Sequence, residues 1–345
     1  MSRIGTSDPI WSAVAGTPGG GSPDPDALAR FADLVGAAAV AALVPGAEAA
    51  LDPAAVRQSR LLNRFRRLQG EKWAGVIAGA GIPVLAIKGL ATARTDWPDP
   101  DARAVSDADL LVRPDDLSAA LDCLMAEGFR FAEMPTRGPW GFVGDASFQP
   151  LIGPEDGANI DLHVQGDAWP FETALTAAQL LESAVEAGPE GLLAPAPAHR
   201  LLIAASHAAG DLFTADAVKS VVDGLLMLRR PEMVDFAALR ALAIRGHLSR
   251  PVANYLALLG ALGAELDPVR AAGFRLPDPE SGELGRVVAA HRALFPAAGE
   301  PGLFGRLRRE ALICAEPRVL LWRNGRRISG MIRPRQGRPD GHGIV

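Results

Sequence analysis

The chain has 345 residues, with 35 Lys and Arg residues against 40 Asp and Glu residues and a formal net charge of −5. A broad nucleic-acid-binding surface usually makes a domain basic, so this balance argues against such a surface, although it leaves room for a local basic groove. The two cysteines, Cys123 and Cys314, lie far apart in the sequence and indicate neither a disulfide framework nor a metal cluster. They suit a reducing compartment.

Residues 1–21 contain no apolar signal core, and the longest apolar run, residues 34–44, is rich in Ala and stops at Pro45. That run is too short to span a bilayer and predicts a helix of the core. We therefore expect a cytoplasmic protein without a membrane partner.

The N-terminal part of the chain divides in two. Residues 1–26 predict a flexible segment, because residues 12–26 are rich in Gly, Ser, Pro and Asp. Residues 27–80 predict a helical region that ends at Gly81 and Pro83. Its apolar positions near helical spacing are Leu61, Phe65, Leu68 and Trp73.

Residues 81–168 carry most of the strand signals. A short buried strand is predicted at 83–89, followed by a helix, and a second strand is predicted at 107–112, followed by a helix that stops at Gly128. Further strand candidates lie at 129–134, 146–152 and 159–164, and a hairpin loop at 153–158 joins the last two. We expect an α+β fold with a small mixed β-sheet as its core.

The remainder of the chain predicts a helical C-terminal domain at 169–330 and a disordered tail at 331–345. The arginines between 306 and 338 suit a solvated terminal helix and tail. A surface that holds phosphate or nucleic acid is the alternative.

Two carboxylates, Asp107 and Asp109, stand directly before the apolar residues of the strand at 107–112. Residues two apart in a strand point to the same face, where like charges repel each other. A shared Mg²⁺ would offset that repulsion, and Asp161, inside another predicted strand, would allow a two-metal site. For each carboxylate alone, a solvated strand position is the alternative.

A phosphate seat is predicted where the strand at 83–89 meets its helix, because Gly89 leaves backbone amides free at the helix start. Lys88 would add positive charge, although an ordinary turn with Lys88 at the surface is the alternative. Arg103 could bind phosphate through both ends of its guanidinium group, or it could pair with Asp99 or Asp101.

Other polar residues carry weaker signals. His163 shares a strand face with Asp161. It orients a carboxylate, lines the acceptor pocket or is a half-buried histidine with satisfied hydrogen bonds. His207 suits a core histidine. Lys219 and Asp223 lie four apart on one helix, which indicates a surface ion pair.

The order of these features resembles the uncharacterised nucleotidyltransferase family of the DNA polymerase beta superfamily. An apolar strand ends in Lys-Gly, an Arg precedes Asp-x-Asp-Leu-Leu-Val, a Gly-aromatic pair ends the next helix, and an Asp-Leu-His strand follows. The match spans 84–164, and a looser one extends it to roughly 55–235. The superfamily usually has Gly-Ser where this chain has Lys88 and Gly89.

This resemblance implies a nucleotidyltransferase core and a Mg²⁺-dependent transfer of NMP from an NTP to an acceptor hydroxyl, with release of pyrophosphate. It implies that Asp107, Asp109 and Asp161 hold the metal, with two ions expected, and that Asp161 also activates the acceptor. The nucleotide-binding residues would be Lys88, Gly89, Arg103 and Lys219. The acceptor is unknown, and nucleic acid is not the expected one.

Two other functions fit the same residues. A non-catalytic nucleotide-binding or partner-regulating protein would use the same fold, and a phosphate-ester hydrolase would use the same metals. If mutual repulsion dominates at Asp107 and Asp109, Asp109→Asn should leave the stability of the metal-free protein unchanged or higher.

Overall fold

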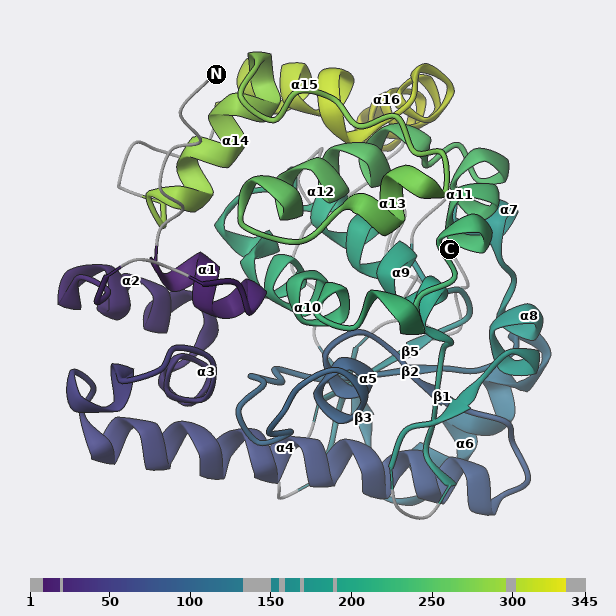
Figure 1. Cartoon of the computed structure of the whole chain (residues 1–345). Helices are drawn as coiled ribbons and strands as arrows, with labels where there is room; N and C mark the ends of the chain where they lie inside the picture. Colours follow the sequence, from purple (N-terminus) through teal and green to yellow (C-terminus); the bar gives the residue numbers. More distant parts are fainter. Residues whose placement is uncertain are drawn as a thin grey trace.

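A computed structural model describes residues 9–18, 21–132, 150–154, 159–167, 171–188, 191–295 and 302–332. The described chain has an α+β fold, in which a mixed seven-stranded sheet is packed between helices. Figure 1 shows the long helix α4 along the bottom of the view, the sheet above it, and layers of helices above the sheet. Some predicted segments lie partly outside the described residues, namely the strand at 146–152, the hairpin loop at 153–158 and the tail.

The sheet has the strand order β3-β4-β5-β2-β1-β7-β6. The strands are β1 (Leu85–Ala86), β2 (Ala108–Leu111), β3 (Arg130–Phe131), β4 (Leu151–Ile152), β5 (Asn159–His163), β6 (Val185–Glu186) and β7 (Leu193–Ala194). At its centre β2 runs parallel to β5 and antiparallel to β1, and β4 and β5 form the expected antiparallel pair. Strands β6 and β7 lie in the region that the sequence predicts as helical, so they were not anticipated.

Helices surround the sheet. The first six are α1 (Pro9–Ala15), α2 (Pro25–Val35), α3 (Ala37–Leu43), α4 (Pro53–Gly79), α5 (Lys88–Thr95) and α6 (Leu117–Ala126). The next six are α7 (Phe171–Ala174), α8 (Ala177–Glu182), α9 (Pro197–Gly210), α10 (Val218–Leu228), α11 (Phe236–Arg245) and α12 (Ser249–Ala261). The last four are α13 (Asp267–Ala271), α14 (Gly282–Arg292), α15 (Leu303–Arg309) and α16 (Pro317–Ile332).

The two faces of the sheet pack against different cores. Residues Ala86, Leu110 and Leu162 belong to a smaller apolar cluster that includes buried residues of α4 and α6. The alternate residues Leu85 and Leu111 belong to a larger cluster built with α9, α10 and other helices. This alternation follows from the two-residue period of a strand.

A helix forms where the sequence predicts a flexible N-terminal segment. The side chains of Ile10, Trp11 and Val14 in α1 are buried, and the Trp11 indole donates a hydrogen bond of 2.7 Å to the carbonyl oxygen of His291. The sequence signal was missed because a seven-residue helix has few apolar positions and a Gly-rich stretch follows it. The apolar run at 34–44 does form part of the core, but Gly36, with φ +94°, separates α2 from α3.

Helix α4 confirms the helix predicted in its region but buries a different face. Of the expected apolar positions Trp73 is buried, whereas Leu61, Phe65 and Leu68 are exposed. The buried stripe of α4 contains Asn63, Arg67, Gly70, Ala74 and Ile77. The amide of Asn63 and the guanidinium of Arg67 bind the loop before β2 through Asp101, so polar residues take the place of an apolar stripe.

Within the described ranges, no helix combines the length and the apolar character needed to cross a membrane. Both cysteines are free thiols, and Cys314 is buried. The segment boundaries inferred from the sequence stay a prediction.

Candidate active site

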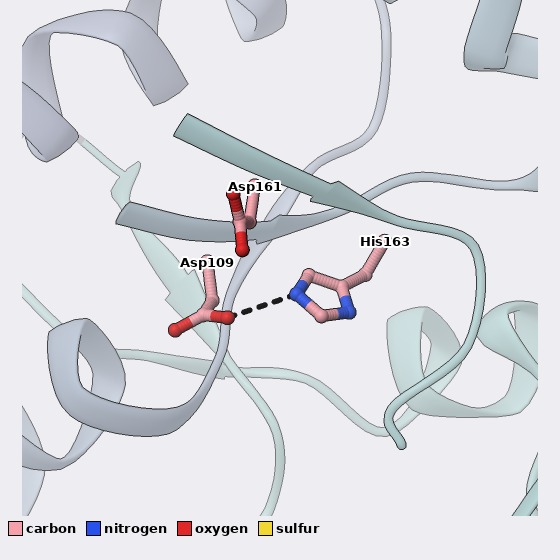
Figure 2. Close-up of side chains that lie close together, drawn as sticks. All are labelled: Asp109, Asp161 and His163. Carbon is pink, nitrogen blue, oxygen red and sulfur yellow. Dashed lines mark hydrogen bonds and ion pairs between the residues drawn. The ribbon is translucent and has the colours of Figure 1, made fainter. Parts of the chain in front are cut away.

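Two carboxylates meet at the centre of the sheet. Asp109 on β2 and Asp161 on β5 are register partners in a parallel pair of strands, so their side chains project from the same face. Figure 2 shows the Asp161 carboxylate pointing toward Asp109, with His163 beside them. Each of the three residues offers one ligand atom, and these atoms lie within 4.8 Å of one another. The adjacency of the strands at 107–112 and 159–164, which the sequence only suggested, is therefore correct.

Asp109 is buried and receives two hydrogen bonds on a single oxygen. Its Oδ1 lies 2.8 Å from the ammonium of Lys88 and 2.8 Å from Nε2 of His163. A carboxylate can only accept, so Nε2 of His163 carries the proton. Burial by itself would raise the pKa of Asp109, but the charge of Lys88 and the hydrogen bond from His163 outweigh it, and the pKa lies far below its ordinary value. Asp109 is therefore a carboxylate with a fixed orientation.

Lys88 reaches Asp109 from an unusual backbone conformation. It is the first residue of α5 and has φ +49°, in the left-handed region that favours glycine. Burial opposes its charge, but the charges of Asp109, Asp167 and Asp107 more than compensate and raise its pKa above the ordinary value. The sequence placed Lys88 near a phosphate or at the surface, whereas its ammonium lies on a carboxylate of the candidate metal site.

Asp107 lies just before the first residue of β2 and is half-buried. Its Oδ1 accepts a hydrogen bond of 2.7 Å from the hydroxyl of Ser106. It is not a member of the close group formed by Asp109, Asp161 and His163, although it lines the same pocket as the two aspartates.

Arg103 makes a buried ion pair that neither sequence interpretation anticipated. Its Nε and one terminal nitrogen donate to the two oxygens of Asp223 on α10 at 2.9 and 2.8 Å, and the other terminal nitrogen donates to the carbonyl of Ala104. The Trp97 indole also donates to Asp223, at 2.7 Å. Arg103 thus joins the loop before β2 to α10, and its forked face is directed at a carboxylate.

A second buried pair joins the helices in the same way. Arg200 on α9 donates to both oxygens of Asp96, the residue that ends α5, at 2.9 and 2.8 Å. These two Arg–Asp pairs fix α9 and α10 over the site face of the sheet. Their partners are 104 and 120 residues apart in sequence, so spacing alone gave no signal for either pair.

A pocket of about 430 Å³ lies between the sheet and these helices. The residues that line it from the sheet side include Lys88, Gly89, Arg103, Asp107, Asp109 and Asp161. Those that line it from α9, α10 and the turn between them include Arg200, His207, Asp211, Asp216, Lys219 and Asp223. All seven site residues named from the sequence therefore border one cavity.

Lys219 differs from the other cations of the pocket. Lys88, Arg103 and Arg200 each have a carboxylate partner, whereas within the described part of the chain no carboxylate lies within ion-pair distance of the Lys219 ammonium. Burial is the main reason that the pKa of Lys219 lies below its ordinary value, and the charge of Arg103 lowers it further. The surface ion pair with Asp223 that its spacing suggested does not form.

His207 and Asp211 stand on the helical side of the pocket. They are four residues apart at the end of α9, and Nε2 of His207 lies 3.6 Å from Oδ2 of Asp211. The His207 side chain is 39% exposed, so the core histidine expected from the sequence is wrong. Burial raises the pKa of Asp211, and nearby Asp216 and Asp167 act in the same direction.

The residues at the centre of the pocket suit a hard divalent cation. Asp109 and Asp161 offer carboxylate oxygens, which Mg²⁺ and Mn²⁺ prefer. Because His163 donates its Nε2 proton to Asp109, it holds that carboxylate in place, as residues behind metal ligands commonly do. The donor set therefore fits the cation implied by the sequence.

A family model described as uncharacterised nucleotidyltransferase matches residues 28–263, about two thirds of the chain. That range includes the sheet, the aspartates and helices α9 and α10. A comparison with curated proteins finds no match. With its strands, carboxylates and pocket inside the matched range, the chain belongs to the uncharacterised nucleotidyltransferase family.

Proposed function

We propose that the protein is a Mg²⁺-dependent nucleotidyltransferase that moves NMP from an NTP to an acceptor hydroxyl and releases pyrophosphate. The observation that carries this proposal is the alignment of Asp109 and Asp161 on parallel strands at the floor of a pocket. Membership of the nucleotidyltransferase family supports the class of reaction.

In this proposal Asp107, Asp109 and Asp161 hold the metal, which when bound neutralises phosphate charge and favours ionisation of the acceptor hydroxyl. Asp161 helps to accept the proton of that hydroxyl. The acceptor oxygen forms a bond to the α-phosphorus, and the bond from that phosphorus to the oxygen bridging to the β-phosphorus breaks. The electron pair leaves with pyrophosphate.

The triphosphate would lie between Lys219 and the start of α5. Lys219 is suited to bind phosphate because its ammonium has no carboxylate partner among the described residues. Gly89 gives a close backbone approach at the helix start. A Cβ at Gly89 would lie 3.6 Å from the Arg103 guanidinium, so Arg103 adds positive charge beside this seat while bonded to Asp223.

A non-catalytic nucleotide-binding protein is the second candidate. The observation that favours it is the ion pair between Lys88 and Asp109, which already places a positive charge on a candidate metal ligand. The two candidates differ in whether a label at the α-phosphate becomes covalently attached to an acceptor.

The test incubates the protein with each of the four NTPs, labelled separately at the α and γ positions, and with a lysate of its host. We expect only the α label to enter an acceptor, whose mass then identifies the base and the acceptor. Asp161→Asn should abolish this transfer.

Asp122→Asn is a matched control, since Asp122 is exposed on α6, which packs on the other face of the sheet. It should transfer at the normal rate. Entry of the γ label would indicate a kinase, and release of phosphate or NMP into water a hydrolase. Binding without any transfer would favour the second candidate.

A further inference from the structure

The two oxygens of Asp109 have different surroundings. Oδ1 accepts hydrogen bonds from both Lys88 and His163, at 2.8 Å each. No described residue donates a hydrogen bond to Oδ2. Asp109 lines the pocket, so one of its oxygens is already occupied by donors and the other is left for a ligand.

The ammonium on Oδ1 is held firmly. Lys88 starts α5 directly after β1, and the amide of Ile87 donates to the carbonyl of Asp109 at 3.0 Å. The backbone carrying Lys88 is therefore tied to the backbone carrying Asp109. The carboxylates of Asp107 and Asp167 lie close enough to favour the positive charge of Lys88 as well.

Two catalytic metal ions about 3.5–4 Å apart are commonly bridged by a carboxylate that gives one oxygen to each ion. Asp109 belongs to the close group formed with Asp161 and His163, and Lys88 occupies one of its oxygens. We infer that the site binds a single divalent cation, with the Lys88 ammonium fixed in the place of the second. This inference rests on the proposed function and replaces the two ions expected from the sequence.

The Lys88 ammonium brings a positive charge to the site before any metal binds. Of the three carboxylates proposed to hold metal, Asp109 already has this ammonium on one oxygen. His163 donates its Nε2 proton to the same oxygen of Asp109. In this arrangement Lys88 is a positioning residue that keeps Asp109 ionised and directed at one metal.

The test counts ions with Mn²⁺ as the probe and α,β-methylene-ATP as a nucleotide that cannot react at the α-phosphorus. Protein is kept in slight excess over nucleotide, and loss of the free Mn²⁺ signal in electron paramagnetic resonance gives the number of ions bound. Two ions within about 4 Å would also couple magnetically, whereas an isolated ion would keep its resolved hyperfine lines.

We expect one uncoupled Mn²⁺ per chain in the wild type and two coupled ions in Lys88→Gly, since glycine accepts φ +49° without strain. Lys88→Arg keeps the charge and should bind one ion. Thermal melting shows whether each variant is folded, and the wild-type count tests the inference even where a variant is not.

Two coupled ions in the wild type would overturn the inference while leaving metal-dependent transfer intact. A single ion in a folded Lys88→Gly variant would overturn the role given to Lys88. No bound ion in any form would overturn both this inference and the metal dependence of the proposed function.

Discussion

The two faces of strands β2 and β5 differ in chemistry although they alternate along the same residues. Toward α4 and α6 the strands present Ala108, Leu110, Ile160 and Leu162, all buried in an apolar cluster. Toward α9 and α10 they present Asp109, Asp161 and His163. One face anchors the sheet by apolar burial, and this lets the other face hold ionisable groups close together.

The site face compensates its charges by pairing them. Three ion pairs lie on or beside the pocket: Lys88 with Asp109, Arg103 with Asp223, and Arg200 with Asp96. A buried ion pair adds little stability over an apolar pair, but a member that loses its partner is costly. The two faces should therefore respond differently to substitution.

The largest effect is expected when a buried charge on the site side loses its partner. Among the described residues, Arg103→Met leaves the carboxylate of Asp223, which is 5% exposed, with the Trp97 indole as its one remaining donor. We expect a loss of about 3–5 kcal/mol in the free energy of unfolding, measured with urea.

The double variant Arg103→Met/Asp223→Asn removes both charges and keeps an oxygen for Trp97. It should recover much of the lost stability. Equal losses in the single and double variants would mean that the pair matters through its shape and not through its charge.

Asp109→Asn should lower the free energy of unfolding by a smaller amount. From the sequence we expected this variant to be as stable as the wild type or more stable. That expectation considered only repulsion between Asp107 and Asp109, whereas the structure pairs Asp109 with Lys88. Removing the carboxylate leaves a buried ammonium without its charged partner. We expect a loss of about 2 kcal/mol at pH 7 in metal-free buffer.

The pH dependence of the stability difference between wild type and Asp109→Asn tests whether the Lys88–Asp109 pair causes it. The pKa of Asp109 is lowered in the folded state, so its stabilisation is present above the unfolded pKa of about 3.9 and is lost as pH falls toward the folded pKa. The raised pKa of Lys88 gives stabilisation that is complete below about 10.4 and is lost as pH rises further. Wild type and variant should thus differ most between these limits, and a variant as stable as wild type at pH 7 would contradict the pairing.

The smallest changes in stability are expected when a glycine on either side of the sheet is replaced by alanine. A Cβ at Gly70 of α4 would lie 2.9 Å from a methyl carbon of Leu90 and 3.0 Å from Cβ of Ala108. Overpacking should destabilise the protein by about 1–3 kcal/mol, which exceeds the gain of about 1 kcal/mol from the higher helix propensity of Ala. Gly70→Ala should therefore lower stability slightly.

The atoms nearest to a Cβ at Gly89, on the site side, are those of the Arg103 guanidinium at 3.6–3.7 Å, which is ordinary contact distance. The stability of Gly89→Ala should stay within about 0.5 kcal/mol of wild type. A larger loss for Gly89→Ala than for Gly70→Ala, measured in the same urea series, would show that the apolar face is not the tighter one.

Sequence reasoning went furthest where short-range patterns decide the structure. The apolar residues at 110–112 and around Asp161 predicted the two strands that carry the carboxylates, and a C-terminal stop at Gly128 agrees with its φ of +89°. The family pattern supplied the candidate residues, and they border one pocket.

The remaining features depend on contacts that the sequence does not encode locally. The partner of Arg103 lies 120 residues away, and two nearer aspartates were equally plausible. The ammonium of Lys88 reaches Asp109 because its residue takes a left-handed conformation, which is rare for lysine and cannot be anticipated from spacing. The polar stripe of α4 was missed because exposed Leu61 and Phe65 gave the stronger apolar signal.

The hydrogen bond from the Trp11 indole to the carbonyl of His291 has a consequence for how the chain folds during synthesis. The two residues are 280 positions apart, so the ribosome must add all the residues between them before this contact can form. At roughly 5–20 residues per second, this contact forms no sooner than roughly 15–60 s after Trp11 is synthesised. The packing of α1 against α14 is therefore a late event in folding, which must follow the synthesis of the helices between them.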